Sequence, residues 1–179
     1  GIVKTYTNYT RTIIIFGNIF SLLSAICIAV SVLKKNKKDL IWWQIIDVIF
    51  CIFSNIALYA YAALSTNSIA LARNILAYNN KLTKNMTCIF FILCIIVGYT
   101  VNNRGFIGTL PVIASASYTI FMFTTKNEQQ MRWALISNLS LWSIHDIYIQ
   151  AYPTAFIDMI LVVWTFIKIF QCHFHKKVP

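Results

Sequence analysis

The chain has 179 residues, of which 59% are hydrophobic and 11% are charged, and its formal net charge is +10. Because a soluble domain usually carries about 25% charged residues, this composition excludes an ordinary soluble globular fold. Several mostly apolar runs reach about 18 residues, the length that crosses ~30 Å of hydrocarbon, so the sequence predicts an all-α membrane protein with several spans.

Seven transmembrane helices are expected in chain order. The first is expected to be a retained helix, because its apolar run is too long for a signal peptide and no small-residue cleavage site follows it. The third is the shortest and the most polar. The expected segments are residues 12–33, 40–64, 66–78, 86–101, 107–123, 131–150 and 154–171.

An internal repeat relates the first three segments to the last three. A gapless shift of 91 residues aligns the two triplets, and the fourth segment has no counterpart. Repeats of this kind in a membrane chain are typical of transporters whose site lies between the halves. The shift pairs Gly17 with Gly108, Ser24 with Ser115, Trp42 with Trp133, Ala60 with Ala151, Asp47 with Asn138, Asn55 with Asp146 and Asn67 with Asp158.

The unpaired fourth segment has a topological role. Three spans reverse the side on which the chain lies, so a fourth is needed if the second triplet is to start on the same side as the first. The repeats are then parallel, related by an axis along the membrane normal. We therefore expect a first repeat at residues 12–81, a linker helix at 84–102, a second repeat at 107–172 and a cytoplasmic tail at 173–179.

The basic residues predict the orientation. Lys4, Arg11 and Arg104 lie on the side of the N-terminus, whereas eleven basic residues lie on the other side. Because cytoplasmic loops collect Lys and Arg, the N-terminus is expected outside and the C-terminus in the cytoplasm. Charge placed beside the bilayer suits contact with anionic headgroups, and it argues against a nucleic-acid partner, which needs a basic surface on a soluble fold.

Arg73 lies within the third segment, where a charged side chain needs a partner. We expect it to form an intramembrane ion pair with Asp47, Asp146 or Asp158, and the sequence does not assign which. Two interpretations stay open. The pair either fixes helix packing, or it opens in a transport cycle and lets Arg73 hold an anionic group of the solute.

The sixth segment carries the densest set of polar residues. Asn138, Trp142, His145 and Ile149 follow the spacing of one helical face, and Asp146 lies one position round. A tryptophan near midspan beside hydrogen-bonding groups suits stacking on a planar or sugar-like solute, so we predict that Asn138, Trp142, His145 and Asp146 bind substrate. The other interpretation is a packed aromatic with a satisfied histidine.

Three further candidate binding residues come from the repeat. Asn55 is the counterpart of Asp146 and is expected at the same depth. Asn67 and Asp158 are equivalent to each other and lie near the expected starts of the third and seventh segments. Both residue types also cap helices well, so a binding role and a capping role stay open for this pair.

Catalytic and metal sites are not expected. The chain has no Gly-x-Ser-x-Gly, no His-Glu-x-x-His and no phosphate-binding loop, so we expect no enzyme activity and no cofactor. Its five cysteines lie in or at the ends of apolar segments and lack the spacing of a disulfide framework. Cys172, His173 and His175 form a tail cluster that lacks a fourth ligand, so no metal is expected there.

Three short stretches form a distinctive set: LPVI at residues 110–113, Met131-Arg132, and Trp142-Ser-Ile-His145-Asp146. They resemble the Imp-YgjV family of bacterial inner-membrane proteins, in which the last stretch is similar to a W-x-x-H-N element. The likeness also covers Tyr61 through Arg73-Asn74 in the first half, so it spans most of the chain. It implies a multi-pass protein of the bacterial inner membrane. Asp146 departs from the expected Asn and adds a carboxyl group.

The three-one-three plan also resembles, in architecture alone, the SWEET sugar carriers and the PnuC-type vitamin transporters. That resemblance implies a solute held near midspan between two three-helix bundles. We predict a small-solute transporter, working by alternating access or facilitated diffusion, whose solute is a polar metabolite such as a sugar or a nucleoside-like vitamin. The alternative is a non-transporting inner-membrane protein, either a ligand sensor or an assembly factor. A monomer would suffice, and a dimer is equally compatible.

Overall fold

The chain folds as a bundle of helices. The computed structural model describes the backbone of residues 2–34, 36–125 and 128–175, and the side chains from Thr10 to Gln171 except those at 35 and 126–128. Within these residues the chain is all-α, with seven helices, which confirms the expected fold class. The helices are α1 (Ile2–Leu33), α2 (Lys37–Ala57), α3 (Tyr61–Tyr78), α4 (Lys84–Thr100), α5 (Gly105–Thr124), α6 (Glu128–Tyr148) and α7 (Tyr152–His175).

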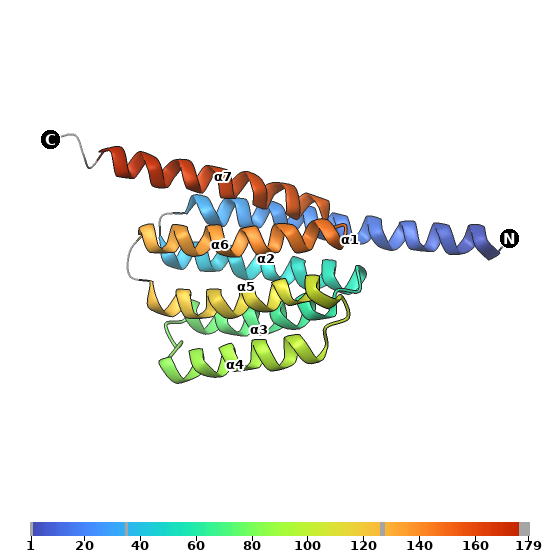
Figure 1. Cartoon of the computed structure of the whole chain (residues 1–179), viewed down its shortest axis with the longest axis horizontal. Helices are drawn as coiled ribbons and strands as arrows, with labels where there is room; N and C mark the ends of the chain where they lie inside the picture. Colours follow the sequence, from blue (N-terminus) through green and yellow to red (C-terminus); the bar gives the residue numbers. More distant parts are fainter. Residues whose placement is uncertain (1, 35, 126–127, 176–179) are drawn as a thin grey trace.

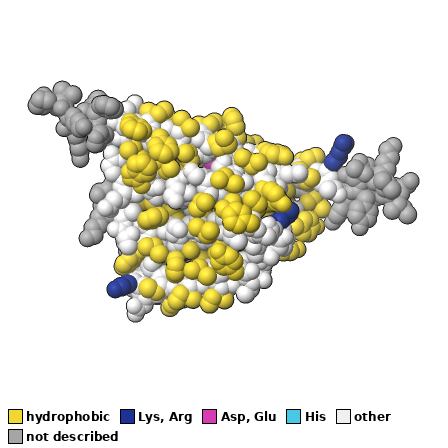
Figure 2. Space-filling view, in the orientation of Figure 1, with side chains coloured by type: hydrophobic (Ala, Val, Ile, Leu, Met, Phe, Trp, Pro, Cys, Tyr) yellow, Lys and Arg dark blue, Asp and Glu magenta, His cyan; other side chains and the backbone are white. Residues whose placement is uncertain are grey.

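Four helices are long and apolar enough to cross a membrane: α1 from Thr10, α2, α5 and α7. Helix α4 is apolar but has only 17 residues, and α3 and α6 carry many of the buried polar side chains. The outer surface bears exposed large hydrophobic side chains along its helices, and hydrophobic side chains cover much of the face seen in Figure 2. An apolar surface of this extent is suited to contact with lipid. The helical backbone is suited to it too, because a helix satisfies its own backbone hydrogen bonds.

Six of the helices form a closed ring. Following the ring, α1 contacts α2, α2 contacts α3, α3 contacts α5, α5 contacts α6, α6 contacts α7, and α7 returns to α1. Helix α4 packs against α3 and α5 from outside the ring. Figure 1 shows that α1 and α5 run in one direction and that α2 and α6 run in the opposite one. The α1–α7 and α5–α3 contacts are equivalent under the 91-residue shift, which is the arrangement that a parallel repeat produces.

The break between the second and third helices lies earlier in the chain than expected. The second helix was expected to continue to Leu64, but α2 ends at Ala57 and α3 already begins at Tyr61. The chain turns at Tyr59, which has a positive φ of 53°. The equivalent turn between α6 and α7 contains Gln150, 91 residues further on, with a φ of 67°. Both repeats therefore use the same left-handed turn at the same place.

The Gln150 turn makes a stability prediction. A side chain at positive φ costs a non-glycine residue about 1–2 kcal/mol, and Gln150 is exposed. Gln150→Gly should therefore stabilise the protein by about 0.5–1 kcal/mol after allowing for the freer unfolded chain. The measurement is the melting temperature in detergent. Gln150→Ala keeps the Cβ atom and is the matched control, and equal melting of the two variants would contradict the strain argument.

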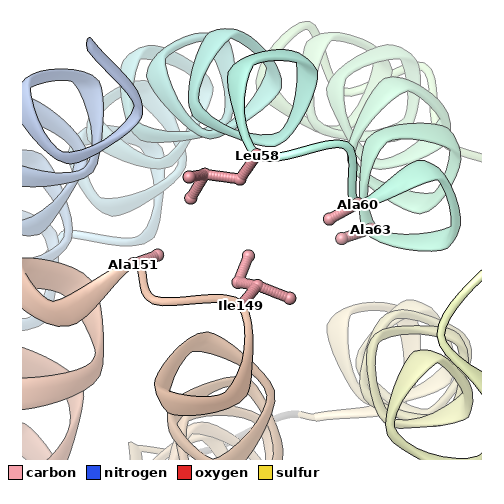
Figure 3. Close-up of a cluster of buried hydrophobic side chains, with 5 residues drawn as sticks. All are labelled: Leu58, Ala60, Ala63, Ile149 and Ala151. Carbon is pink, nitrogen blue, oxygen red and sulfur yellow. The ribbon is translucent and has the colours of Figure 1, made fainter. Parts of the chain in front are cut away.

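An apolar cluster, here called the loop plug, closes the end of the bundle where these two turns lie. It consists of Leu58, Ala60, Ala63, Ile149 and Ala151, all buried. Figure 3 shows Leu58 and Ile149 projecting into the same space from the ends of α2 and α6. Leu58 is equivalent to Ile149, and Ala60 to Ala151, so the plug consists largely of the same turn contributed by each repeat.

Two asparagines, here called the latches, tie each turn to the opposite repeat. Asn18 of α1 donates from Nδ2 to the carbonyl of Gln150 at 3.0 Å and accepts at Oδ1 from the amide of Tyr152 at 3.2 Å. Asn103, which precedes α5, donates to the carbonyl of Tyr59 at 2.7 Å and accepts from the amide of Tyr61 at 3.2 Å. The two turns thus have matching clamps.

The opposite end of the bundle is packed by two further apolar clusters. Tyr118 and Met122 pack with Ala134 and Leu135 at one, and α2 contributes Leu40, Ile41 and Ile45 to the other. Lys37 also donates to the carbonyl of Met122 at 3.3 Å. Lys35, Lys126, Lys176 and Lys177, which entered the orientation count, lie outside the described residues, as do the side chains of the expected tail cluster.

Candidate solute-binding site

A polar cavity lies inside the ring, between the two apolar ends. Its volume is about 70 Å³, well above the ~10–15 Å³ that one water requires. Helices of both repeats line it, and α4 does not. The lining residues are Ser24, Ile28, Gln44, Asp47, Val48, Cys51, Asn67, Ala70, Arg73, Asn74, Ser115, Tyr118, Asn138, Leu139, Trp142, Asp146, Thr154 and Asp158.

The lining follows the repeat. Ten of these eighteen residues form five equivalent pairs, so the pseudo-twofold axis passes through the cavity. The side chains within a pair are related but not identical in chemistry. In two of the five pairs, an amide in one repeat is equivalent to a carboxyl group in the other. The pairs are Ser24 with Ser115, Asp47 with Asn138, Val48 with Leu139, Cys51 with Trp142, and Asn67 with Asp158.

Three carboxyl groups reach the cavity from three different helices. Asp47 of α2 accepts hydrogen bonds from the Ser24 hydroxyl and, at 3.6 Å, from the Cys51 thiol. Asp146 lies on α6 and Asp158 on α7. Asp47 is not one of the binding residues that the sequence predicts, and the structure adds it to the cavity wall.

His145 does not line the cavity with the other predicted binding residues of α6. The helical face that meets the cavity contains Asn138, Trp142 and Asp146, so His145 lies behind the wall. His145 is fully buried, and its Nδ1 lies 2.9 Å from Asp146 Oδ1. Its ring also meets that of Trp142 edge-on, with centroids 5.7 Å apart. His145 therefore orients the two residues that do reach the cavity.

Asn67 and Asp158 are not helix caps. Helix α3 begins at Tyr61 and α7 at Tyr152, so both residues lie at the seventh position of their helix. Both are buried on the cavity wall. Because the helices start earlier than expected, the structure excludes the capping role for this pair. Both side chains are placed where they could contact a solute.

Asn55 lies outside the central cavity, in a second and smaller one. That cavity has a volume of about 10 Å³ and lies on the plug side, lined by Ser54, Asn55 and Ala151 among others. Trp142 and Asp146 line both cavities. A solute passing between the central cavity and the loop plug would therefore pass the indole of Trp142.

Arg73 does not form the expected ion pair. Among the described residues its guanidinium contacts neutral acceptors: Nε and Nη2 donate to Asn74 Oδ1 at 3.0 and 2.9 Å, and Nη1 donates to Thr119 Oγ1 at 2.8 Å and to the Ser115 carbonyl at 3.4 Å. The group also lies over the Tyr118 ring, 5.3 Å from its centroid. Neutral oxygens and an aromatic face thus stabilise the buried guanidinium in place of the expected carboxylate.

This arrangement predicts that Arg73 is not replaceable by lysine. Lysine keeps the charge but cannot reproduce the planar fork that contacts Asn74 and Thr119 together. Arg73→Lys should destabilise the protein by about 2–3 kcal/mol through the lost hydrogen bonds. The measurement is the melting temperature in detergent, with Arg11→Lys, on the exposed part of α1, as the control. Tolerance of lysine would instead indicate a simple charge pair.

Several cavity residues were not predicted from the sequence. Gln44 donates to the Tyr118 hydroxyl at 2.9 Å and so connects α2 to α5. Thr154 of α7 lies 2.8 Å from Ser21 of α1, hydroxyl to hydroxyl. The repeat held one usable signal, the Ser24–Ser115 identity, which places two small hydroxyls on facing walls. Gln44 and Thr154 have apolar counterparts, Leu135 and Ala63, so the repeat gave no sign of them.

The cavity can hydrogen-bond a solute on opposite sides and stack it against an indole. In the described residues no group of three or more His, Cys, Asp or Glu side chains converges as a metal site would require. Carboxyl and amide oxygens dominate the wall formed by α2, α6 and α7, whereas the guanidinium of Arg73 faces α5. The site is therefore polar, asymmetric and shared by both repeats.

A model of one protein family matches residues 15–176 of the chain, which is most of the bundle. That family is Imp-YgjV, described as a bacterial inner membrane protein. No curated protein and no solved structure matches the chain. The likeness to SWEET and PnuC-type carriers therefore stays a prediction.

Proposed function

The chain belongs to the Imp-YgjV family of bacterial inner-membrane proteins, and we propose that it carries a small polar solute across that membrane. The observation that supports this most directly is the polar cavity shared by the two repeats. Buried polar groups inside a membrane bundle are expensive, so a cavity lined by so many of them favours a functional site over simple packing.

Apolar packing at both ends of the bundle supports alternating access in particular. The loop plug packs equivalent turns of the two repeats together at one end, and separate apolar clusters pack at the other. Rocking one repeat against the other would separate one of these ends while the other stays packed. In this mechanism Trp142 stacks on the solute, and Asn138, Asp146, Asn67 and Asp158 hydrogen-bond it.

Orientation and stoichiometry complete the proposal. The loop plug lies at the end from which α1 projects (Figure 1), so with the N-terminus outside it forms the outer seal. The two repeats that line the cavity belong to the same chain. A monomer would therefore suffice for this proposal, and a dimer is equally compatible with it.

A transport assay on Trp142→Ala tests this function. A panel of polar metabolites is first screened for thermal stabilisation of the purified protein, and any stabilising solute is then followed by counterflow in proteoliposomes. Loss of the indole should reduce exchange by about tenfold or more, since stacking and its shielding from water contribute about 1–3 kcal/mol.

The matched control is Trp133→Ala, which removes an exposed indole of the same helix. If Trp142→Ala exchanges solute as fast as the parent, the pocket assignment fails. If stabilising solutes bind but never exchange, the protein is a ligand sensor and not a carrier.

A further inference from the structure

The acidic residues of this chain are concentrated in one place. The sequence has five, Asp39, Asp47, Glu128, Asp146 and Asp158, and three of them line the central cavity. They come from three helices, α2, α6 and α7. A buried carboxylate is stabilised by positive charge beside it, so a cation in the cavity would stabilise the charged form of all three.

Arg73 does not pair with these carboxyl groups. Its guanidinium is the one basic group on the wall, and its hydrogen bonds go to Asn74, Thr119 and Ser115. No carboxylate takes part in them. Asp158 makes no hydrogen bond to any other part of the chain that the structure describes, although it is only 5% exposed. Its oxygens are left facing the cavity.

Unpartnered amide atoms point to the same space. Gln44 is 5% exposed and donates to Tyr118, yet its Oε1 has no hydrogen-bond partner. Asn67 is also 5% exposed, and its Nδ2 has no partner. Both side chains line the cavity. Buried amides are rarely left so, and a bound group that donates to Gln44 and accepts from Asn67 would satisfy both.

We propose that the cavity selects a small organic cation, an alkylammonium group carried on a short polar chain. The ammonium donates to Asp158, Asp146 and Gln44 Oε1, and a hydroxyl or second polar group accepts from Asn67 Nδ2. Trp142 shields the alkyl chain. This rests on the proposed function, in which the same cavity is the solute site, and it replaces the neutral sugar-like solute expected from the sequence.

A size-matched series of butane derivatives tests the charge requirement. The probes are 1,4-diaminobutane, 4-aminobutan-1-ol and butane-1,4-diol, which have two, one and no ammonium groups on the same carbon chain. Thermal stabilisation of the purified full-length protein in detergent is measured at constant ionic strength. The two amines should stabilise it at concentrations about tenfold or more below those needed for the diol.

Two substitutions locate the effect. Asp158→Asn removes a charge from the wall and introduces the residue that its repeat partner already has, so the helix should pack as before. It should raise the half-saturating amine concentration by about tenfold or more. Asp39→Asn, on the exposed first turn of α2, is the matched control and should leave that concentration unchanged. Asp146→Asn serves as a second variant should Asp158→Asn lose stability.

The outcomes separate this inference from the transport proposal. Equal stabilisation by the diol, an unchanged amine response in both wall variants, or full replacement of the amine by potassium alone overturns the organic-cation site. Neutral solutes that exchange in counterflow would then leave the transporter standing. Amines that bind at the wall but do not exchange would keep the cation site and remove the transporter.

Discussion

Joining Leu58 to Ile149 by a disulfide is expected to reduce solute exchange by about tenfold or more, and reduction of the disulfide should restore it. The two residues belong to different repeats and lie in the same apolar cluster, the loop plug (Figure 3). Alternating access requires the repeats to separate at each end of the cavity in turn. A covalent link between the turns removes one of those two states.

The experiment uses one protein as its own control. The five native cysteines are replaced, Leu58→Cys and Ile149→Cys are introduced, and exchange is measured before oxidation, after oxidation and after reduction. Mass spectrometry measures how completely the link forms. Fully linked protein that exchanges at the unlinked rate would show that these turns do not move apart during transport.

A second link tests whether any disulfide would do the same. Phe20 and Phe53 stack with ring centroids 5.2 Å apart, on α1 and α2 of the same repeat. A disulfide between Phe20→Cys and Phe53→Cys ties two helices that should move together. Exchange should survive this link. Equal inhibition by both links would point to general stiffening and not to a gate.

The turn that contains Leu58 is a helix break that the hydropathy pattern does not indicate but the internal repeat does. Residues 57–61 read Ala-Leu-Tyr-Ala-Tyr, an apolar stretch with no glycine or proline, so the expected second helix ran through it. The equivalent stretch ends just before Pro153, which marks a helix start. Carrying Pro153 back by 91 residues gives position 62, which places a helix start next to Tyr61, where α3 begins.

The sequence predicts which residues of α6 share one helical face, but it does not predict which part of that face lines the cavity. Asn138 and Trp142 fix one side of α6, and residues 145 and 146 lie on either edge of that side. Which edge faces the cavity depends on how α6 is rotated between its neighbours α5 and α7. That rotation is set by packing across the ring, so a single helix cannot show that Asp146 is on the wall and His145 behind it.

The predicted ion pair of Arg73 is wrong for a different reason. The rule that a buried arginine needs a carboxylate counts charges, whereas the structure satisfies its donors with an amide, a hydroxyl and a carbonyl. The Ser115 carbonyl accepts hydrogen bonds from both the Thr119 hydroxyl and Arg73. Hydrogen-bond capacity of this kind depends on which helix lies opposite, and the order of helices in the ring is not visible in composition.

Removing both latches should open the path from the loop plug to the cavity. Asn18→Ala and Asn103→Ala together delete four hydrogen bonds that tie the turns to the opposite repeats. At about 0.5–1.5 kcal/mol for each bond, the closed arrangement loses about 2–6 kcal/mol. A change of ~1.4 kcal/mol shifts an equilibrium tenfold, so the open population should rise by well over that factor.

Cys51 reports that opening. It lines both the central cavity and the smaller cavity next to the plug. With the other four cysteines replaced, a membrane-impermeant thiol reagent applied from the side of the N-terminus should label it about tenfold or more faster in the double variant than in the parent. Each single variant should give an intermediate rate, because the two latches hold separate turns.

Asn79→Ala is the matched control for this experiment. Asn79, like Asn103, is an exposed asparagine that donates to a backbone carbonyl, that of Ile75 at 2.8 Å, but it lies at the other end of the bundle. Its loss should leave labelling unchanged. Faster labelling from the opposite side of the membrane would reverse the orientation that the basic residues predict, and an unchanged rate from both sides would mean that the plug opens independently of its latches.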